Sequence, residues 1–248
     1  FAGINLIKSL VNDNRFIITL VDKNNYHFFP PLIYQVATSF IEASNISYPF
    51  RKLFSNYKNV RFYMGSLVRV IPETKRIETE NGELQYDELV LAMGTESNFF
   101  GMENVQKCAL PMKTIDEAIY VRNYMLLTME EAARNKNVKD SPKLQNIVIA
   151  GGGPTGVELA GMIAEMGQYI AEKEYPEINR SFSHIYLIDA LPSLLSPMSK
   201  MAQEAAYDKL NKLGVKIILN VAVKDYIDSK VMLADGKSIE TETLIWTS

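Results

Sequence analysis

"QNIVIAGGGPTGVELAG", residues 145–161, is the stretch that decides the fold. An apolar, β-favouring run at 147–149 precedes its glycines, and a helix-forming stretch from Val157 to Ala171 follows them. A strand that passes into a helix through G-x-G-x-x-G is the fingerprint of a dinucleotide site. The first glycine permits a tight turn, the second lets the backbone approach a pyrophosphate, and the third lets the helix pack closely on the strand. We predict a dinucleotide site here; the alternative is a glycine turn without a ligand.

Two further features of this stretch favour a ligand at the start of the helix. Pro154 suits the first helical turn, where the N–H that proline lacks would have no partner. Small and apolar residues recur at helical spacing from 156 to 170, as in a helix that lies on a sheet. The N-terminal amides of such a helix point at a bound anion. The residues predicted to contact the dinucleotide are Gly151, Gly153, Pro154, Thr155 and Gly156.

The composition is that of a soluble globular chain. Its 248 residues are 47% hydrophobic and 22% charged, enough for one large core or two smaller ones. The net charge of -3 gives no reason to expect nucleic acid, and no apolar run approaches the roughly 20 residues of a membrane span. Cys108 is the single cysteine, which rules out an internal disulfide, a C-x-x-C pair and a cysteine-rich metal site. His27 and His184 lie far apart in sequence, so we predict no metal site.

The chain contains one pattern twice. The first copy runs from "FAGINLIKSL" to "RFIITLVDKNN", and the second from "GPTGVELAGM" to "SHIYLIDALPS". In each copy a glycine enters a helix, and an apolar β-run then ends in an aspartate, Asp22 or Asp189. Each copy continues with a strand, a ribbon that turns at 81–82 or 235–236, and an apolar return strand. Two copies of a βαβ-plus-ribbon unit imply two dinucleotide sites.

The two aspartates are candidate ribose contacts. An acid at the end of the second strand of such a unit accepts hydrogen bonds from a ribose, about 20 residues after the glycines. Asp22 lies 19 residues after Gly3, whereas Asp189 lies 38 residues after Gly151. The polar segment at 172–184 can absorb the excess as an extended helix and loop. The common alternative for either aspartate is a strand-end turn residue.

In five segments the chain resembles the single-subunit type II NADH:quinone oxidoreductases, a branch of the two-dinucleotide-binding-domain flavoproteins. These segments follow the family's order and approximate spacing: "VDKNNYHFFPPLIYQVAT", "LVLAMGT", "PMKTIDEAIYVRN", "IVIAGGGPTGVELAG" and "LPSLLSPMSKMAQEAAYDKLNKLGVKI". The resemblance implies an α/β fold of two Rossmann-like three-layer dinucleotide-binding units, each with an antiparallel β-ribbon, the NAD unit inserted in the FAD unit. It also implies an FAD-binding domain at 1–111 and an NADH-binding domain at 112–248.

The resemblance assigns residues of the first copy to FAD. By this likeness, Phe1, Ala2 and Gly3 match the end of the first glycine loop, against the FAD pyrophosphate. Asp22 and Lys23 match the contact with the adenosine ribose.

Further matches lie later in the same copy. Leu67 and Val68 match the strand whose backbone meets the adenine, and Ala92 and Gly94 match the short turn that closes back on the FAD.

The segment that contains Pro31, Leu32 and Gln35 matches the part of such enzymes that runs beside the isoalloxazine ring. From the residues alone, this segment could equally be a loop whose aromatic side chains at 26, 28 and 29 fill a core.

Glu158 matches the acid that lies near the meeting point of nicotinamide and flavin in this family. The residues allow a plainer interpretation. Glu158, Glu165 and Glu172 fall seven apart on one helical stripe, and such stripes are usually solvated. An acid in a first helical turn is also favourable for the helix dipole alone.

The implied function is that of an FAD-dependent, non-electrogenic NADH dehydrogenase. Hydride passes from NADH to the flavin, and electrons then pass to a quinone. The lone Cys108 excludes a disulfide acceptor and disfavours sulfide:quinone oxidoreductases. The alternatives are a ferredoxin- or rubredoxin-type acceptor, oxygen, or a nucleotide-sensing module without turnover. A carboxylate at Asp189 predicts a preference for NADH over NADPH.

The resemblance also implies a location in the cell, and it implies that the sequence is a fragment of a longer protein. It implies a peripheral protein on the cytoplasmic face of the inner membrane, held there by a C-terminal amphipathic segment, and association into a homodimer. Residue 1 falls inside the first glycine loop, and the sequence stops at Ser248, after which the repeat expects a glycine next. We therefore expect a soluble fragment that binds FAD weakly or not at all.

Overall fold

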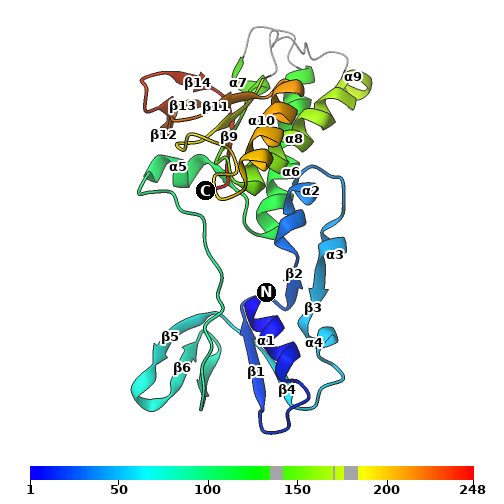
Figure 1. Ribbon diagram of the computed structural model, residues 1–248, viewed down its shortest axis with the longest axis vertical. Helices are drawn as coiled ribbons and strands as arrows, with labels where there is room; N and C mark the ends of the chain where they lie inside the picture. The colour runs from blue at the N-terminus through cyan, green and yellow to red at the C-terminus, as the bar shows by residue number, and fades with distance from the viewer. Residues whose placement is uncertain (135–141, 170, 176–183) are drawn as a thin grey trace. The chain divides into compact units, whose positions relative to one another are not determined.

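The computed structural model describes residues 1–134, 142–169, 171–175 and 184–248 (Figure 1). They form two compact units. The first unit comprises 1–29 and 46–95, and the second comprises 30–45 and 96–248.

The division by packing differs from the division drawn from sequence at residue 111. Residues 30–45 and 96–111 pack with the second unit. The sequence-based boundary divides the residues by the ligand they are expected to bind and not by how they pack. It stays a prediction.

The first unit holds a short parallel sheet, a strand pair and an antiparallel ribbon. Its elements, in chain order, are α1 (Ala2–Leu10), β1 (Ile18–Asp22), β2 (Tyr26–Phe28), β3 (Ser47–Pro49), α4 (Phe50–Leu53), β4 (Val60–Met64), β5 (Leu67–Ile71), η2 (Pro72–Thr74), β6 (Arg76–Thr79) and β7 (Gly82–Gln85). A further helix, α3 (Ala43–Ile46), lies at the division between the units.

A small core holds α1 on the parallel pair β1–β4. The helix places Ile4, Ile7 and Val11 on one face, at the spacing that a buried helical stripe requires. These side chains pack with the buried rings of Phe50 and Phe54. The predicted glycine–helix–strand–aspartate order of the first copy is therefore present, since α1 is followed by β1 and β1 ends at Asp22.

The predicted return strand of the first copy is wrong. Residues 89–99 have no regular secondary structure, and Val90, Leu91 and Met93 are exposed. In the second copy the return strand pairs with the strand before the glycine loop. Among the described residues no strand precedes α1, so residues 89–92 have no such partner to pair with.

The second unit is built on a five-stranded parallel sheet (Figure 1). The strand order is β11-β10-β9-β15-β8. Chain order runs from β9 outward to β10 and β11 on one side, while β15 and β8 lie on the other. The topological switch point, where α/β sheets bind ligands, therefore falls between β9 and β15. The strands are β8 (Leu110–Pro111), β9 (Ile147–Ala150), β10 (Ile185–Ile188), β11 (Lys216–Ile218) and β15 (Thr243–Trp246).

Helices and a ribbon complete this unit. The ribbon is a three-stranded antiparallel sheet of β12 (Val223–Ile227), β13 (Lys230–Leu233) and β14 (Ser238–Glu240). The helical elements are η1 (Pro30–Leu32), α2 (Ile33–Ala37), α5 (Glu103–Cys108), α6 (Ile115–Arg134), α7 (Pro142–Gln145), α8 (Pro154–Tyr169), α9 (Ala171–Glu174) and α10 (Lys200–Lys212).

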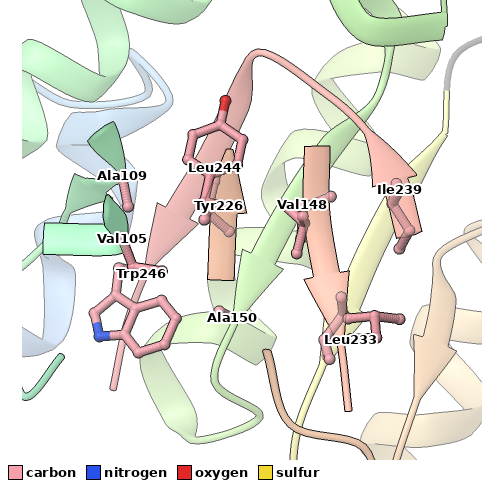
Figure 2. Packing of buried hydrophobic residues seen from close by; sticks show 11 residues of the cluster. Val105, Ala109, Val148, Ala150, Tyr226, Leu233, Ile239, Leu244 and Trp246 are labelled. Atoms are coloured by element: carbon pink, nitrogen blue, oxygen red, sulfur yellow. The ribbon is translucent and has the colours of Figure 1, made fainter. Parts of the chain in front are cut away.

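Side chains of the central strands point alternately to the two faces of the sheet, so that the ribbon with α5 covers one face and helices cover the other. Val148 and Ala150 of β9 and Leu244 and Trp246 of β15 join the ribbon and α5 in one buried cluster, shown in Figure 2. The residues between them, such as Ile149, are fully buried and point to the opposite face, since side chains alternate along a strand. Helix α8 packs against β9 and β10, and α2 and α10 pack on α8. The predicted α/β fold with ribbons is confirmed.

The two units repeat small details as well as element order. In the first, the Gly65 N–H donates to the backbone carbonyl of Asp22 at 2.9 Å. In the second, the Val221 N–H donates to the backbone carbonyl of Asp189 at 3.2 Å. The first strand of each ribbon, β5 or β12, carries a register shift. No helix in the described parts of the chain is long and apolar enough to cross a membrane.

Candidate functional site

The glycine loop joins β9 to α8, as predicted. Gly151 has φ +119°, a conformation that L side chains rarely adopt. A Cβ on Gly156 would overlap the carbonyl oxygen of Gly151. These glycines therefore have the predicted geometric roles, a tight turn at Gly151 and close packing at Gly156.

The space in front of the helix start is open. A Cβ on Gly153 would meet no described atom within 4 Å. Gly153 is followed by Pro154, which has no N–H, so the first free amides of the helix belong to Gly153, Thr155 and Gly156. They lie at the positive end of the helix dipole. An anionic group such as a pyrophosphate can approach this backbone without meeting a side chain at Gly153.

Asp189 follows β10 directly and contacts the glycine loop. One carboxylate oxygen, Oδ1, accepts a hydrogen bond from the Leu191 N–H at 2.7 Å. The other, Oδ2, accepts from the N–H of Gly152. The first contact is the turn role that was the alternative prediction. The second contact brings the aspartate to the loop despite the long connection, of which residues 176–183 lie outside the described part of the chain.

A cleft of about 400 Å³ lies beyond Asp189, between the loop after β10 and helix α10. Its lining side chains carry two carboxylates and no cationic group. The Leu194 side chain also lies 2.9 Å from the position that a Cβ on Gly152 would take. Most of its lining falls in "LPSLLSPMSKMAQEAAYDKLNKLGVKI", a segment of the resemblance to which no ligand was assigned. Its lining residues are Pro192, Ser193, Leu194, Gln203, Glu204, Tyr207, Asp208 and Leu219.

The segment after β15 borders the other side of the loop, and sequence reasoning missed it. The Thr247 hydroxyl donates to the carbonyl of Ala150 at 3.0 Å and to that of Gly151 at 3.2 Å. The indole N–H of Trp246 donates to the Asn98 carbonyl at 2.9 Å. The internal repeat held the signal, because it aligns "LIWTS" with "VLAMGT", a segment that was assigned to a ligand.

Glu158 lies in the first turn of α8 and is exposed. The surrounding protein nevertheless desolvates its carboxyl group and raises the pKa of Glu158. Glu165, one stripe position along, forms an ion pair with Lys209 at 3.3 Å. The side chain of Glu172 lies outside the described residues. Glu158 therefore differs from Glu165, which has a cationic partner.

The residues matched to the FAD pyrophosphate gather at the start of α1. Phe1 is its N-cap, and its ring lies 5.1 Å from that of His27 and 5.6 Å from that of Phe29, centroid to centroid. A Cβ on Gly3 would lie 3.5 Å from the Cβ of Ala92. The structure thus brings together two segments, near residues 3 and 92, that were assigned to one ligand.

The residues matched to the adenosine end of FAD lie on or just after strands. The Asp22 carboxylate accepts from the Asn24 N–H at 2.8 Å, the same turn contact that Asp189 makes with Leu191. Lys23 and Val68 are exposed. The remaining matched positions of this unit are Ala2 on α1, Leu67 on β5, and Gly94, which has φ +76°.

The segment matched to the isoalloxazine ring belongs to the second unit. Pro31 and Leu32 form η1, and Gln35 lies on α2. Helix α2 packs against α6 and against α8, the helix that carries Glu158. Of the aromatic residues in the alternative interpretation, Tyr26 and Phe28 are half-buried and Phe29 is exposed.

Cys108 is the last residue of α5, and its thiol is free and exposed. Within the described ranges, no group of His, Cys, Asp and Glu side chains is arranged to hold a metal ion.

Residues 1–248 match the family model of the pyridine nucleotide-disulphide oxidoreductases, and the chain belongs to this family. Among curated proteins, it is 30% identical over 256 residues to the type II NADH:quinone oxidoreductase Ndh of Mycobacterium tuberculosis, covering 100% of this chain and 55% of that protein. It is 25% identical to the type II NADH:quinone oxidoreductase of Haemophilus influenzae, covering 93% of this chain and 57% of that protein. The chain spans about half the length of the curated relatives it matches.

Solved structures share the fold. The NDH2 structure from Plasmodium falciparum in complex with NADH superposes with a TM-score of 0.88 at 24% identity, covering 96% of this chain and 52% of that one. The sulfide:quinone oxidoreductase of Aquifex aeolicus has a TM-score of 0.76 at 20% identity, covering 99% and 55%. The predicted resemblance to the type II NADH:quinone oxidoreductases is confirmed.

Proposed function

We propose that the second unit binds NADH across the carboxyl ends of its parallel strands. The pyrophosphate lies on the free amides at the start of α8, and the ribose lies at Asp189. The cleft lined by Leu194 and Tyr207 takes the adenine. The observation that carries this proposal is the hydrogen bond from the Gly152 N–H to Asp189, because it sets a ribose acceptor directly beside the phosphate-binding backbone.

We propose that the first unit binds FAD through the residues matched by resemblance. The approach of Gly3 to Ala92 supports a shared ligand. The start of α1 presents free amides in the same manner as α8. The ligand-based division, FAD at 1–111 and NADH at 112–248, belongs to this proposal.

We propose that the whole protein is an NADH:quinone oxidoreductase that transports no charge across a membrane. Bound FAD would accept a hydride from NADH and pass electrons to the quinone. The chain's own residues bind and orient: Asp189 holds the ribose, the α8 amides hold the phosphates, and Glu158 lies on the helix that packs against α2. The name of the Mycobacterium tuberculosis relative, a type II NADH:quinone oxidoreductase, supports this proposal.

The remaining parts of the proposal rest on resemblance. They are a peripheral position on the cytoplasmic face of the inner membrane and assembly into a homodimer. The fold does not select the acceptor, because the ferredoxin reductase of Rhodopseudomonas palustris superposes with a TM-score of 0.76 at 16% identity.

The single tryptophan offers a direct test of nucleotide binding. Trp246 is buried at the end of β15, next to the residue that contacts the glycine loop. Reduced nicotinamide absorbs where tryptophan emits, so NADH bound at this loop should quench Trp246 emission by energy transfer. A titration of residues 1–248 that shows no saturable quenching, together with no binding by calorimetry, would contradict the NADH site.

The activity is tested on the whole protein. Steady-state NADH oxidation with a soluble quinone analogue should proceed. Rapid flavin bleaching by NADH without quinone turnover would favour a ferredoxin- or rubredoxin-type acceptor or oxygen. The absence of bleaching would favour a nucleotide-sensing module.

A further inference from the structure

The hydroxyl of Thr247 lies at the centre of the glycine loop. It donates to the backbone carbonyls of Ala150 and Gly151, the last residue of β9 and the first glycine. It lies 2.6 Å from the position that a Cβ on Gly151 would take, and 2.9 Å from the corresponding position at Gly156. One hydroxyl therefore bonds the end of the strand and the turn, and it lies close to the space where a Cβ on Gly156 would be.

The peptide unit between Gly151 and Gly152 is held from both sides. Its carbonyl oxygen accepts from Thr247, and its N–H donates to Asp189. The next carbonyl, that of Gly152, accepts from the Leu195 N–H at 2.8 Å. These partners come from two distant parts of the chain, the segment after β15 and the loop after β10, so tertiary contacts rather than the loop's own hydrogen bonds fix its conformation.

We infer that Thr247 is a positioning residue for the bound dinucleotide, one that acts through the glycine loop. This inference rests on the proposed NADH site. A glycine-rich turn has more conformational freedom than any other segment, and a backbone that must present amides to a phosphate needs that freedom removed. The Thr247 hydroxyl restricts the conformational freedom of the glycine loop from the β15 side, at the switch point. Asp189 restricts it from the β10 side.

The inference predicts a specific division among ligands. Loss of the hydroxyl should lower the affinity for ligands that place a pyrophosphate on the loop. It should leave unchanged the affinity for a ligand that occupies only the ribose and adenine positions. NADH and ADP-ribose are of the first kind, and adenosine is of the second. A loss of general stability would instead weaken all of them in parallel.

The experiment compares Thr247→Ala with Thr247→Ser in residues 1–248. NADH is titrated by quenching of Trp246 emission, ADP-ribose by calorimetry and adenosine by NMR. Thr247→Ala should raise the Kd for NADH and for ADP-ribose by about tenfold, because the carbonyls of Ala150 and Gly151 lose the hydroxyl donor that they share. Thr247→Ser, which keeps the hydroxyl, should stay within about twofold of the unmodified chain. If Thr247→Ala fails to fold, Thr247→Val, which keeps the side-chain shape, replaces it.

The outcomes separate the inference from the proposed function. Equal NADH affinity in Thr247→Ala and the unmodified chain would overturn the inference alone, as would a Thr247→Ser variant as weak as Thr247→Ala. A parallel loss of adenosine affinity would also overturn it, since the role would then be structural. Failure of the unmodified chain to bind NADH or ADP-ribose would overturn the proposed function and the inference with it.

Discussion

The carboxylate of Asp189 accepts a hydrogen bond from the backbone N–H of Gly152, a residue 37 positions earlier in the chain. The same carboxylate accepts from Leu191, so each of its oxygens is oriented by one amide. A carboxylate oxygen has two acceptor sites, which leaves room for a ribose hydroxyl. The contact therefore links the residue proposed to hold the ribose to the loop proposed to hold the phosphates.

The first prediction concerns nucleotide choice. The unmodified chain should bind NADH at least about 100-fold more tightly than NADPH, because like charges at such a site cost several kcal/mol. Asp189→Ala should weaken NADH binding, since the Gly152 N–H loses its acceptor. It should also narrow the ratio between the affinities for NADH and NADPH to about tenfold or less. Quenching of Trp246 emission measures both affinities. Asp235→Asn, which removes a carboxylate at the ribbon turn, is the control and should keep the ratio. Equal affinity of the unmodified chain for both nucleotides would refute the assignment of Asp189.

The second prediction separates two glycines of one helix. Gly156→Ala should lower the free energy of unfolding by about 3 kcal/mol, because the added methyl group overlaps the Gly151 carbonyl. Gly161→Ala is the matched control. Its Cβ would lie 3.6 Å from the Leu210 side chain, an ordinary contact, so the substitution should stabilise α8 by about 0.5 to 1 kcal/mol. Urea unfolding measures both. Equal effects of the two substitutions would be inconsistent with a close approach at Gly156.

The third prediction concerns pH. Desolvation raises the pKa of Glu158 in the folded protein, so the folded state retains this proton to a higher pH than the unfolded chain does. Ionisation of Glu158 therefore opposes folding as the pH rises through this window. Glu158→Gln should raise the Tm at neutral pH, and the difference should disappear below about pH 4, where the carboxyl is protonated in both states. Glu165→Gln, which breaks the ion pair with Lys209, should show no such gain at neutral pH. A lower Tm for Glu158→Gln at pH 7 would contradict the prediction.

The fourth prediction is that Cys108 takes no part in the chemistry. It is exposed at the end of α5, on the last residue of the helix rather than at a helix start. Cys108→Ser should leave NADH affinity and, in the longer protein, NADH oxidation within a few-fold. The thiol should react with a maleimide in the folded protein at the rate of an exposed cysteine. A 100-fold loss of NADH oxidation in the serine variant would indicate that the Cys108 thiol takes part in the reaction.

The fifth prediction concerns flavin. In the first unit the described parallel sheet has two strands, and Val90, Leu91 and Met93 are exposed. A sheet of two strands is marginally stable by itself. Residues 1–248, expressed alone, should therefore carry much less than one FAD per chain after gel filtration, whereas the longer protein should retain it. Absorbance of the bound flavin measures this. Stoichiometric FAD on residues 1–248 would show that the first unit is a complete site.

The sequence by itself determined the elements whose causes are local. Gly151 and Gly156 mark a strand-to-helix turn because a Cβ is excluded at both positions. The spacing of these glycines is recognisable in the sequence alone. The two aspartates were found at strand ends because the apolar runs before them define the strands. The repeat of ribbon and turn was visible because hairpins depend on short-range patterns.

Only the tertiary structure decided which of these elements acquire partners. "LVLAMGT" and "LIWTS" look alike, yet β15 is a strand and residues 89–92 are not, because a strand needs a neighbour to satisfy its backbone. The repeat marked the segment that contains Thr247 but not its contacts with the glycine loop, since these arise when β15 pairs with β9. The contact of Asp189 with Gly152 likewise forms because β10 pairs with β9 in register, which places the end of one strand beside the turn that follows the other. Pairing between strands distant in sequence depends on hydrogen bonds and packing that no local pattern encodes.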